Sequence, residues 1–210
     1  VGARQRALAQ AEKIAEVQGR TKASGASLWT QVGPVGFDSV IEPTWGRMSG
    51  RVRSLAIDPT NGNRLLLGSA TGGVWLSTNG GTSWAPLTDT QPSLAIGAVA
   101  IDPSNPNVFY AGTGEGNGTY YSAGILKSVD SGATWTVLGA TQFNRGAISG
   151  MAVSPDGSAL VVCARSGQTL NGGSVGTNVG GIYRSTDGGQ TFTQTANNFC
   201  SSLAVVADDF

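Results

Sequence analysis

The octapeptide "STNGGTSW" at residues 77–84 returns as "SVDSGATW" at 128–135 and as "STDGGQTF" at 185–192. In each copy an asparagine or aspartate stands third, a glycine fifth and an aromatic residue last. The side-chain oxygen of asparagine or aspartate accepts hydrogen bonds from nearby backbone N–H groups, and glycine adopts positive φ without steric cost. We therefore predict that each octapeptide is a tight turn, followed by a strand that begins with a buried aromatic ring.

The segments around the octapeptides repeat as well, which divides most of the chain into three units at 51–88, 96–138 and 147–195. Each unit holds four short β-rich runs separated by glycine, proline, asparagine and aspartate. Four antiparallel strands per repeat are typical of a β-propeller blade. The sequence therefore predicts an all-β fold, a β-propeller with about three complete four-stranded antiparallel blades. In the first unit the expected strands are residues 52–57, 65–68, 73–76 and 83–87.

The ends of the chain do not form complete units. The stretch "SLWTQVGP" at 27–34 resembles an isolated outer strand, and 201–210 resembles the first strand of a fourth blade. Known propellers typically have four to eight blades, so we expect this chain to be the N-terminal part of a larger ring. The open blade edge would then contact the rest of the propeller or another chain. Residues 1–26 are expected to be a short helix and a linker, outside the propeller domain at 27–210.

Composition excludes several function classes. Lysine plus arginine and aspartate plus glutamate number 13 each, so nothing favours a nucleic acid partner, and no apolar run is long enough to span a membrane. The chain has no histidine, which excludes a Ser-His-Asp triad and an ordinary zinc site within it. We predict no cofactor and no metal, although calcium bound by Glu115, Asn117 and backbone carbonyls stays open. Cys163 and Cys200 form either one disulfide or two buried thiols.

The octapeptides resemble the Asp box, or bacterial-neuraminidase repeat, Ser-x-Asp-x-Gly-x-Thr-Trp. The second copy matches every fixed position, the third has Phe192 in place of tryptophan, and the first has Asn79 and Ser83. The phrase "AIDPSNPNVFYAGT" at 100–113 looks most like the xyloglucanase-like and sortilin-like branch. The resemblance implies a propeller in enzymes and non-enzymes alike, so it leaves function open. The structural residues it implies are Ser77, Asn79, Gly81, Trp84, Ser128, Asp130, Gly132, Trp135, Ser185, Asp187, Gly189 and Phe192.

Candidate ligand-binding residues fall in segments of variable length. In a propeller blade, the link between the second and third strands lies on the same face as the link to the next blade. The link "TDTQPS" at 88–93 and the loop around residues 114–123 are expected on that face. Aromatic rings combined with amides and a carboxylate suit sugar recognition, although such loops are also common without any ligand. The candidates are Trp45, Arg47, Arg51, Glu115, Asn117, Tyr120, Tyr121, Asn144 and Arg145.

Two functions are compatible with these residues. The first is a non-catalytic binding or assembly scaffold that contacts a glycan or a protein partner, outside the cytoplasm. The alternative is a glycoside hydrolase, which needs two carboxyl groups about 5–5.5 Å apart for retention or about 6.5–9.5 Å apart for inversion. The candidate acids are Asp38, Glu42 and Glu115. We favour the scaffold, because these acids match no catalytic motif.

Overall fold

The computed structural model describes residues 50–116, 120–166, 179–198, 200, 201 and 203, together with short backbone strands at 37–38 and 47–48. The chain divides into two compact units, Val1–Val32 and Gly33–Phe210, and every described residue belongs to the second. The expected N-terminal helix and the expected strand at 27–34 lie outside the described residues, as does most of the expected strand at 201–210. The short strands β1 (Phe37–Asp38) and β2 (Arg47–Met48) pair antiparallel.

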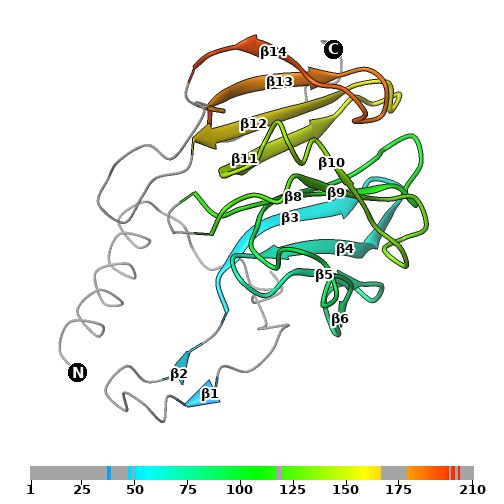
Figure 1. Ribbon diagram of the computed structural model, residues 1–210. Coiled ribbons are helices and arrows are strands. Elements are labelled where there is room, and N and C mark those ends of the chain that lie inside the picture. The colour runs from blue at the N-terminus through cyan, green and yellow to red at the C-terminus, as the bar shows by residue number, and fades with distance from the viewer. Residues whose placement is uncertain are drawn as a thin grey trace, which may run out of the picture. The chain divides into compact units, whose positions relative to one another are not determined.

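Three four-stranded antiparallel sheets make up the described part of the chain (Figure 1). Blade 1 consists of β3 (Val52–Asp58), β4 (Asn61–Ser69), β5 (Val74–Ser77) and β6 (Ala85–Pro86). Blade 2 consists of β7 (Ile96–Ile101), β8 (Phe109–Thr113), β9 (Ile125–Ser128) and β10 (Thr136–Leu138). Blade 3 consists of β11 (Gly146–Val153), β12 (Leu160–Ser166), β13 (Gly181–Ser185) and β14 (Thr193–Ala196).

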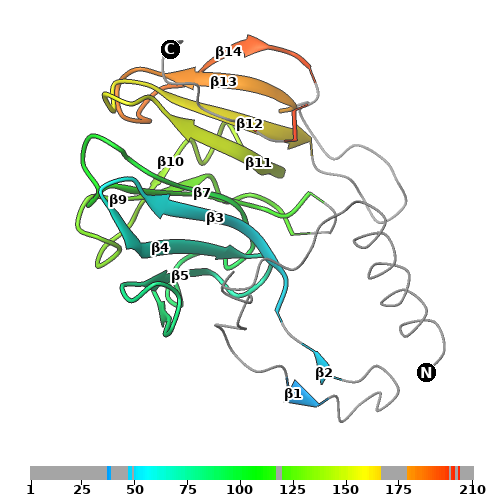
Figure 2. The ribbon, with the colours of Figure 1, turned by 180° about the vertical axis from the view of Figure 1, so that it is seen from behind.

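The strand order confirms the predicted all-β blade architecture. Within each sheet the strands follow one another in chain order, and the first strands lie together, with β3 against β7 and β7 against β11 (Figures 1 and 2). The outermost strand of blade 1 is shorter than expected, because β6 holds two residues and ends at Pro86. Proline cannot donate a ladder hydrogen bond and is tolerated only at such an edge.

Apolar side chains fill the space between consecutive blades. Between blades 1 and 2 the core contains Leu66, Ile96 and Phe109, and all three are fully buried. Between blades 2 and 3, the fully buried Phe143 contacts Tyr183 and Phe192 edge-on, with ring centroids 5.1 Å apart in both pairs. Edge-to-face pairs of this kind stabilise a core beyond the area that they bury.

Each octapeptide joins the third and fourth strands of its blade, as predicted. In the second copy the Gly132 N–H donates to Ser128 Oγ at 2.8 Å, and the Thr134 N–H donates to Asp130 Oδ1 at 2.8 Å. Gly132 has a φ of 90°, which an L side chain rarely adopts. The other two copies repeat this pattern of bonds. The expectation of a buried ring that begins the strand was wrong in detail, because the aromatic residue precedes the strand and is only partly buried.

Acid is expected to weaken the second and third octapeptide turns. Hydrogen bonds from the side chain and backbone of Thr134 lower the pKa of the Asp130 carboxyl to about 2. The corresponding bonds from Thr191 hold the pKa of Asp187 well below its ordinary value. Because an aspartate in the unfolded chain titrates near 3.9, this stabilisation is present above about pH 4 and is lost as the pH falls toward about 2. The thermal unfolding midpoint, measured from about pH 5 to about pH 2, tests this.

The first octapeptide supplies a matched control. There the Asn79 Oδ1 accepts the Ser83 N–H at 2.9 Å, and Asn79 Nδ2 donates to Ser83 Oγ at 2.8 Å. An amide therefore makes the same turn without a titrating group. Asp130→Asn should keep the turn and reduce the acid dependence of the unfolding midpoint. An unchanged acid dependence in this variant would contradict the role given to Asp130.

A disulfide joins Cys163 in β12 to Cys200, with the two Cα atoms 5.4 Å apart. This settles the two alternatives that the sequence left open. The bond fastens the segment after β14 to the middle of blade 3. No helix in the described part of the chain is long and apolar enough to cross a membrane.

Candidate functional site

A shallow groove of about 330 Å³ lies where loops of blades 1 and 2 meet. The link between β4 and β5 contributes one residue, the link between β6 and β7 contributes four, and the loop between β8 and β9 contributes two tyrosines. Loops of these two kinds were expected to share one face, and here they line one groove. The lining residues are Thr71, Pro92, Ser93, Leu94, Ala95, Tyr120 and Tyr121.

The two tyrosines present large ring surfaces to solvent. Tyr120 is 54% exposed and Tyr121 is 38% exposed, next to Leu94 at 37%. Exposed rings beside an apolar wall are suited to stacking against the C–H face of a sugar, while hydroxyl groups bind the sugar's own hydroxyls. The sequence identified both tyrosines and placed the link at 88–93 on the same face, but it singled out no residue of the groove's other wall, since proline, serine and alanine in a link carry no distinctive signal.

Backbone hydrogen bonds hold the tyrosine loop at both ends. At its start the Glu115 N–H donates to the Tyr120 carbonyl oxygen at 2.9 Å. At its end the Ser122 N–H donates to the Gly146 carbonyl oxygen at 2.8 Å, which connects the loop to the start of blade 3. The hydroxyl of Thr113 also donates to the Gly124 carbonyl oxygen at 2.6 Å inside the base of the loop. The tyrosines therefore lie between two anchored positions.

The buried carboxylate of Glu115 in blade 2 forms ion pairs with two arginines of blade 1, which are partly exposed. This carboxylate lies 2.9 Å from Arg51 Nη2 and 3.8 Å from Arg53 Nε, and the Glu115 side chain is 1% exposed. Arg51 and Arg53 flank Val52 at the beginning of β3, whereas Glu115 directly follows the second strand of blade 2. Sequence reasoning selected Glu115 and Arg51 separately but missed Arg53 and the pairing itself.

The remaining candidates lie in the exposed link before β11, in strands β1 and β2, or outside the described part of the chain. Asn144 and Arg145 are exposed in the link before β11, and Arg145 has a φ of 61°. The backbones of Asp38 and Arg47 pair across β1 and β2. Trp45, Glu42 and Asn117 lie outside the described residues.

The described lining of the groove offers aromatic rings and hydroxyl groups for binding, but no carboxylic acid. None of the described residues that line it carries a carboxyl group. Glu115 is near in sequence, but burial and two guanidinium groups occupy its carboxylate. No cluster of three metal-ligating side chains occurs among the described residues. The arrangement is therefore suited to binding a neutral polyhydroxylated ligand.

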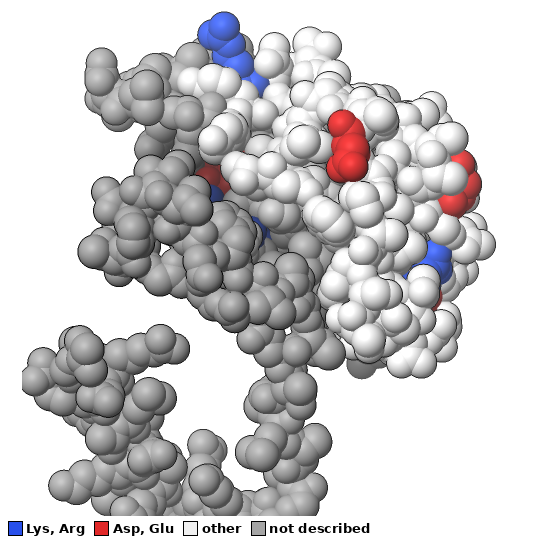
Figure 3. All heavy atoms as spheres, turned by 90° about the horizontal axis from the view of Figure 1, so that it is seen from below, with Lys and Arg blue, Asp and Glu red and all other residues white. Residues whose placement is uncertain are grey.

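Charge is sparse on the described surface. Figure 3 shows one face, on which Lys, Arg, Asp and Glu side chains are scattered among uncharged residues. A groove that binds nucleic acid needs a basic stripe that follows the phosphate backbone. The described part of this face carries no such stripe.

Among known proteins, the chain is similar to xyloglucanases. It is 31% identical to a xyloglucanase of Hypocrea jecorina (strain QM6a) over 134 residues, which cover 57% of this chain and 15% of that protein. It is 28% identical to a xyloglucanase of Paenibacillus sp, over 84% of this chain and 19% of that protein. The chain thus spans less than a fifth of the length of these relatives. No family model matches it.

Solved structures agree on the fold. The GH74 enzyme of Niastella koreensis is 28% identical, with a TM-score of 0.52 over 69% of this chain and 21% of that one. An ancestral GH74 enzyme is 20% identical, with a TM-score of 0.57 over 84% of this chain and 20% of that one. The chain is therefore a xyloglucanase-like β-propeller segment.

Proposed function

We propose that this chain forms part of the glycan-binding face of a xyloglucanase-like glycoside hydrolase. The observation that carries the proposal is the groove in which two half-exposed tyrosines face a wall of small and apolar residues. Its ligand is a neutral polysaccharide of the xyloglucan type. Tyr120 and Tyr121 stack on the sugar rings, and Thr71 and Ser93 bind hydroxyl groups.

The comparisons favour the hydrolase alternative over the non-catalytic scaffold. Both curated relatives are named xyloglucanases, and the similar structures are GH74 enzymes. In our proposal the described residues contribute binding, and the catalytic acids lie elsewhere in the protein. This assignment fits the geometry, because a glycosidase needs two carboxyl groups at the scissile bond and the described residues of the groove lining supply none.

Two finer assignments accompany this proposal. We assign the three octapeptides to the Asp box, because all three share the serine and the Asn or Asp acceptor in the same hydrogen-bonded turn. We also propose a location outside the cytoplasm. The Cys163–Cys200 disulfide supports it, since such bonds persist mainly in oxidising compartments.

Removing the tyrosine rings is expected to weaken sugar binding. Tyr120→Ala and Tyr121→Ala should each raise the dissociation constant for a xyloglucan oligosaccharide about tenfold, because each loses a stacking surface worth roughly 1.4 kcal/mol. The double variant should bind about a hundredfold more weakly if the two rings contact separate sugar units. Isothermal titration calorimetry measures these affinities.

The matched control uses an exposed apolar residue away from the groove. Val129 lies in the second octapeptide turn and is 63% exposed. Val129→Ala should leave affinity unchanged, and Tyr120→Phe should keep most of the binding because the ring remains. Equal affinity of the unaltered chain and the double tyrosine variant would refute the proposed groove.

A further inference from the structure

The tripeptide Thr-Asn-Gly occurs twice in blade 1, at residues 60–62 and 78–80. An asparagine that precedes glycine is prone to spontaneous deamidation, because the unhindered glycine nitrogen attacks the asparagine side-chain carbonyl carbon. Both tripeptides are exposed to solvent. Since the two tripeptides are identical, a difference in their reactivity arises from the fold around them.

Hydrogen bonds fix the second of these asparagines in the first octapeptide turn. Asn79 Oδ1 accepts the Ser83 N–H at 2.9 Å and the Ser77 hydroxyl at 3.0 Å, and Asn79 Nδ2 donates to Ser83 Oγ at 2.8 Å. The attacking nitrogen is occupied as well, because the Gly80 N–H donates to the Asn63 carbonyl oxygen at 2.9 Å. Reaction at Asn79 therefore requires this turn to open.

The side chain of the first asparagine is held at one atom. Asn61 Oδ1 accepts the Asn63 N–H at 3.1 Å, while Asn61 Nδ2, the group that leaves as ammonia, has no hydrogen-bond partner among the described residues. Gly62 lies in an irregular part of β4 that has no residue opposite it in β3. A Cβ at Gly62 would meet no atom within 4 Å apart from its own chain neighbours. The fold therefore leaves this asparagine and its glycine free to react.

The turn between β7 and β8 of blade 2 has the same hydrogen bonds but a different residue after its asparagine. Its sequence "DPSNPN" at 102–107 aligns with "DPTNGN" of blade 1. The Asn107 N–H donates to Asn105 Oδ1 at 3.2 Å, as the corresponding N–H does in blade 1. Pro106 stands in place of Gly62, and proline has no N–H with which to begin the reaction. Blade 2 therefore contains an unreactive counterpart of the same turn.

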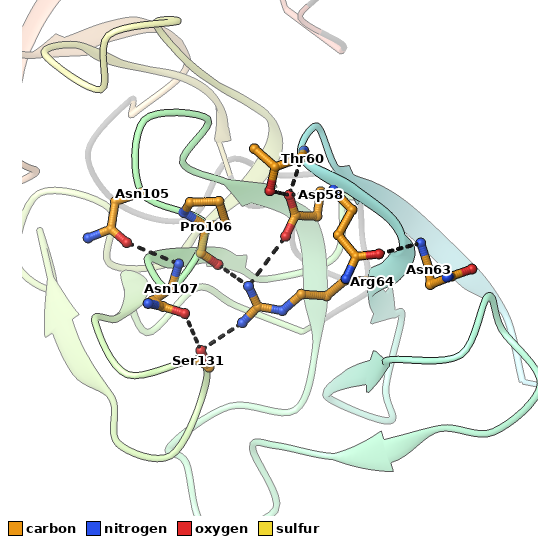
Figure 4. Close-up of polar contacts among 9 residues, drawn as sticks. Asp58, Thr60, Asn63, Arg64, Asn105, Pro106, Asn107 and Ser131 are labelled. Carbon is orange, nitrogen blue, oxygen red and sulfur yellow. Dashed lines mark hydrogen bonds and ion pairs between the residues drawn. The ribbon is translucent and has the colours of Figure 1, made fainter.

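Arg64 connects these two turns across the junction of blades 1 and 2. Its guanidinium group donates to the Pro106 carbonyl oxygen and to Ser131 Oγ, both at 2.6 Å (Figure 4). The same group lies 3.4 Å from Asp58 Oδ2 in its own turn. Deamidation of Asn61 would place a second carboxylate in the turn that contains Asp58. The reaction would therefore change the charge beside a contact between two blades.

We propose that Asn61 is a site of spontaneous deamidation, whereas Asn79 and Asn105 are protected from it. The backbone nitrogen of Gly62 loses its proton to solvent and bonds to the Asn61 side-chain carbonyl carbon. The bond from this carbon to Nδ2 breaks, and the nitrogen takes a proton from water and leaves as ammonia. A water molecule then opens the resulting succinimide ring at either carbonyl, which gives aspartate or isoaspartate and adds one negative charge.

The test incubates the full chain in a mildly alkaline buffer made with heavy-oxygen water, and peptide mass spectrometry locates the oxygen that hydrolysis adds. In the folded chain Asn61 should react at least about tenfold faster than Asn79, which needs an opening free energy of about 1.4 kcal/mol for the first octapeptide turn. In concentrated urea the two rates should become similar, because the tripeptides are identical. Equal rates in the folded chain would refute the proposal.

Exchanging the residue that follows each asparagine gives matched variants. Gly62→Pro should abolish labelling at Asn61, and Pro106→Gly should start labelling at Asn105, because the two turns have the same hydrogen bonds. Circular dichroism checks that each variant is folded. If Gly62→Pro does not fold, Gly62→Ala replaces it and should slow labelling, since the added methyl group hinders the attacking nitrogen. An unchanged rate at Asn61 in the folded Gly62 variant, or an unlabelled Asn105 in folded Pro106→Gly, would show that the proposal is wrong.

Discussion

Replacing Gly97 with alanine is expected to destabilise the chain by about 3 kcal/mol or more and to lower its thermal midpoint by roughly 6–12 °C. Gly97 lies in β7, where a Cβ would overlap the carbonyl oxygen of Ile148 in β11 and would lie 2.7 Å from the Gly114 carbonyl oxygen. Both obstacles are backbone atoms, so no change of rotamer relieves the clash. Blades 2 and 3 would have to separate.

Two other glycines calibrate this effect. A Cβ at Gly62 would meet no atom within 4 Å apart from its own chain neighbours, so Gly62→Ala should change the unfolding free energy by less than about 0.5 kcal/mol. Gly68→Ala should have an intermediate effect, because its nearest obstacle is the side chain of Ile96, which can shift. Chemical denaturation of the three variants gives the order. A Gly97 variant as stable as the Gly62 variant would contradict the close packing of β7 on β11.

Sequence periodicity could not have revealed the requirement at Gly97. The equivalent positions carry Arg53 in β3 and Ser149 in β11, so the repeat does not select glycine there. The requirement arises only because β11 passes close to β7. Such a contact depends on the distance between the first strands of neighbouring blades. The pattern of apolar and polar residues along one strand does not predict that distance.

The turns, by contrast, could be predicted residue by residue. The acceptor role of Asn79 and Asp130 and the positive φ of Gly132 follow from bonds within eight consecutive residues. Local chemistry of this kind is visible in the sequence because both partners lie in one short segment. The partial burial of the ring at Trp135 was missed, because it depends on Leu87 of another blade.

The candidate site was predictable only in part, because some of its contacts join residues that lie far apart in the chain. Tyr120 and Tyr121 stood out as aromatic residues in a long loop, and the face on which they lie followed from the blade topology. Glu115 also stood out, but as a candidate acid. Its partner Arg51 is 64 positions earlier in the chain. Only the register of blade 2 against blade 1 brings these side chains together.

Glu115→Gln is expected to cost about 2–3 kcal/mol of folding free energy. Glycan affinity should fall only if the substitution also displaces the loop that carries Tyr120 and Tyr121. The buried carboxylate balances Arg51 and Arg53, and Arg53 Nε is a buried donor without a hydrogen-bond acceptor among the described residues. Removing one partner of a buried pair leaves the other charge uncompensated. The expected cost lies below the range for a fully buried pair, because the Arg51 side chain is 54% exposed.

A double-mutant cycle separates this structural role from catalysis. If Glu115 acts through its ion pair, Arg51→Gln combined with Glu115→Gln should be more stable than the sum of the single effects by roughly 1–2 kcal/mol. Denaturant unfolding of the four proteins measures that coupling. A Glu115→Gln variant of unchanged stability that had lost sugar release from xyloglucan would identify Glu115 as a catalytic acid instead. We expect the opposite pattern, because the Glu115 side chain is 1% exposed and its carboxylate is paired with Arg51 and Arg53.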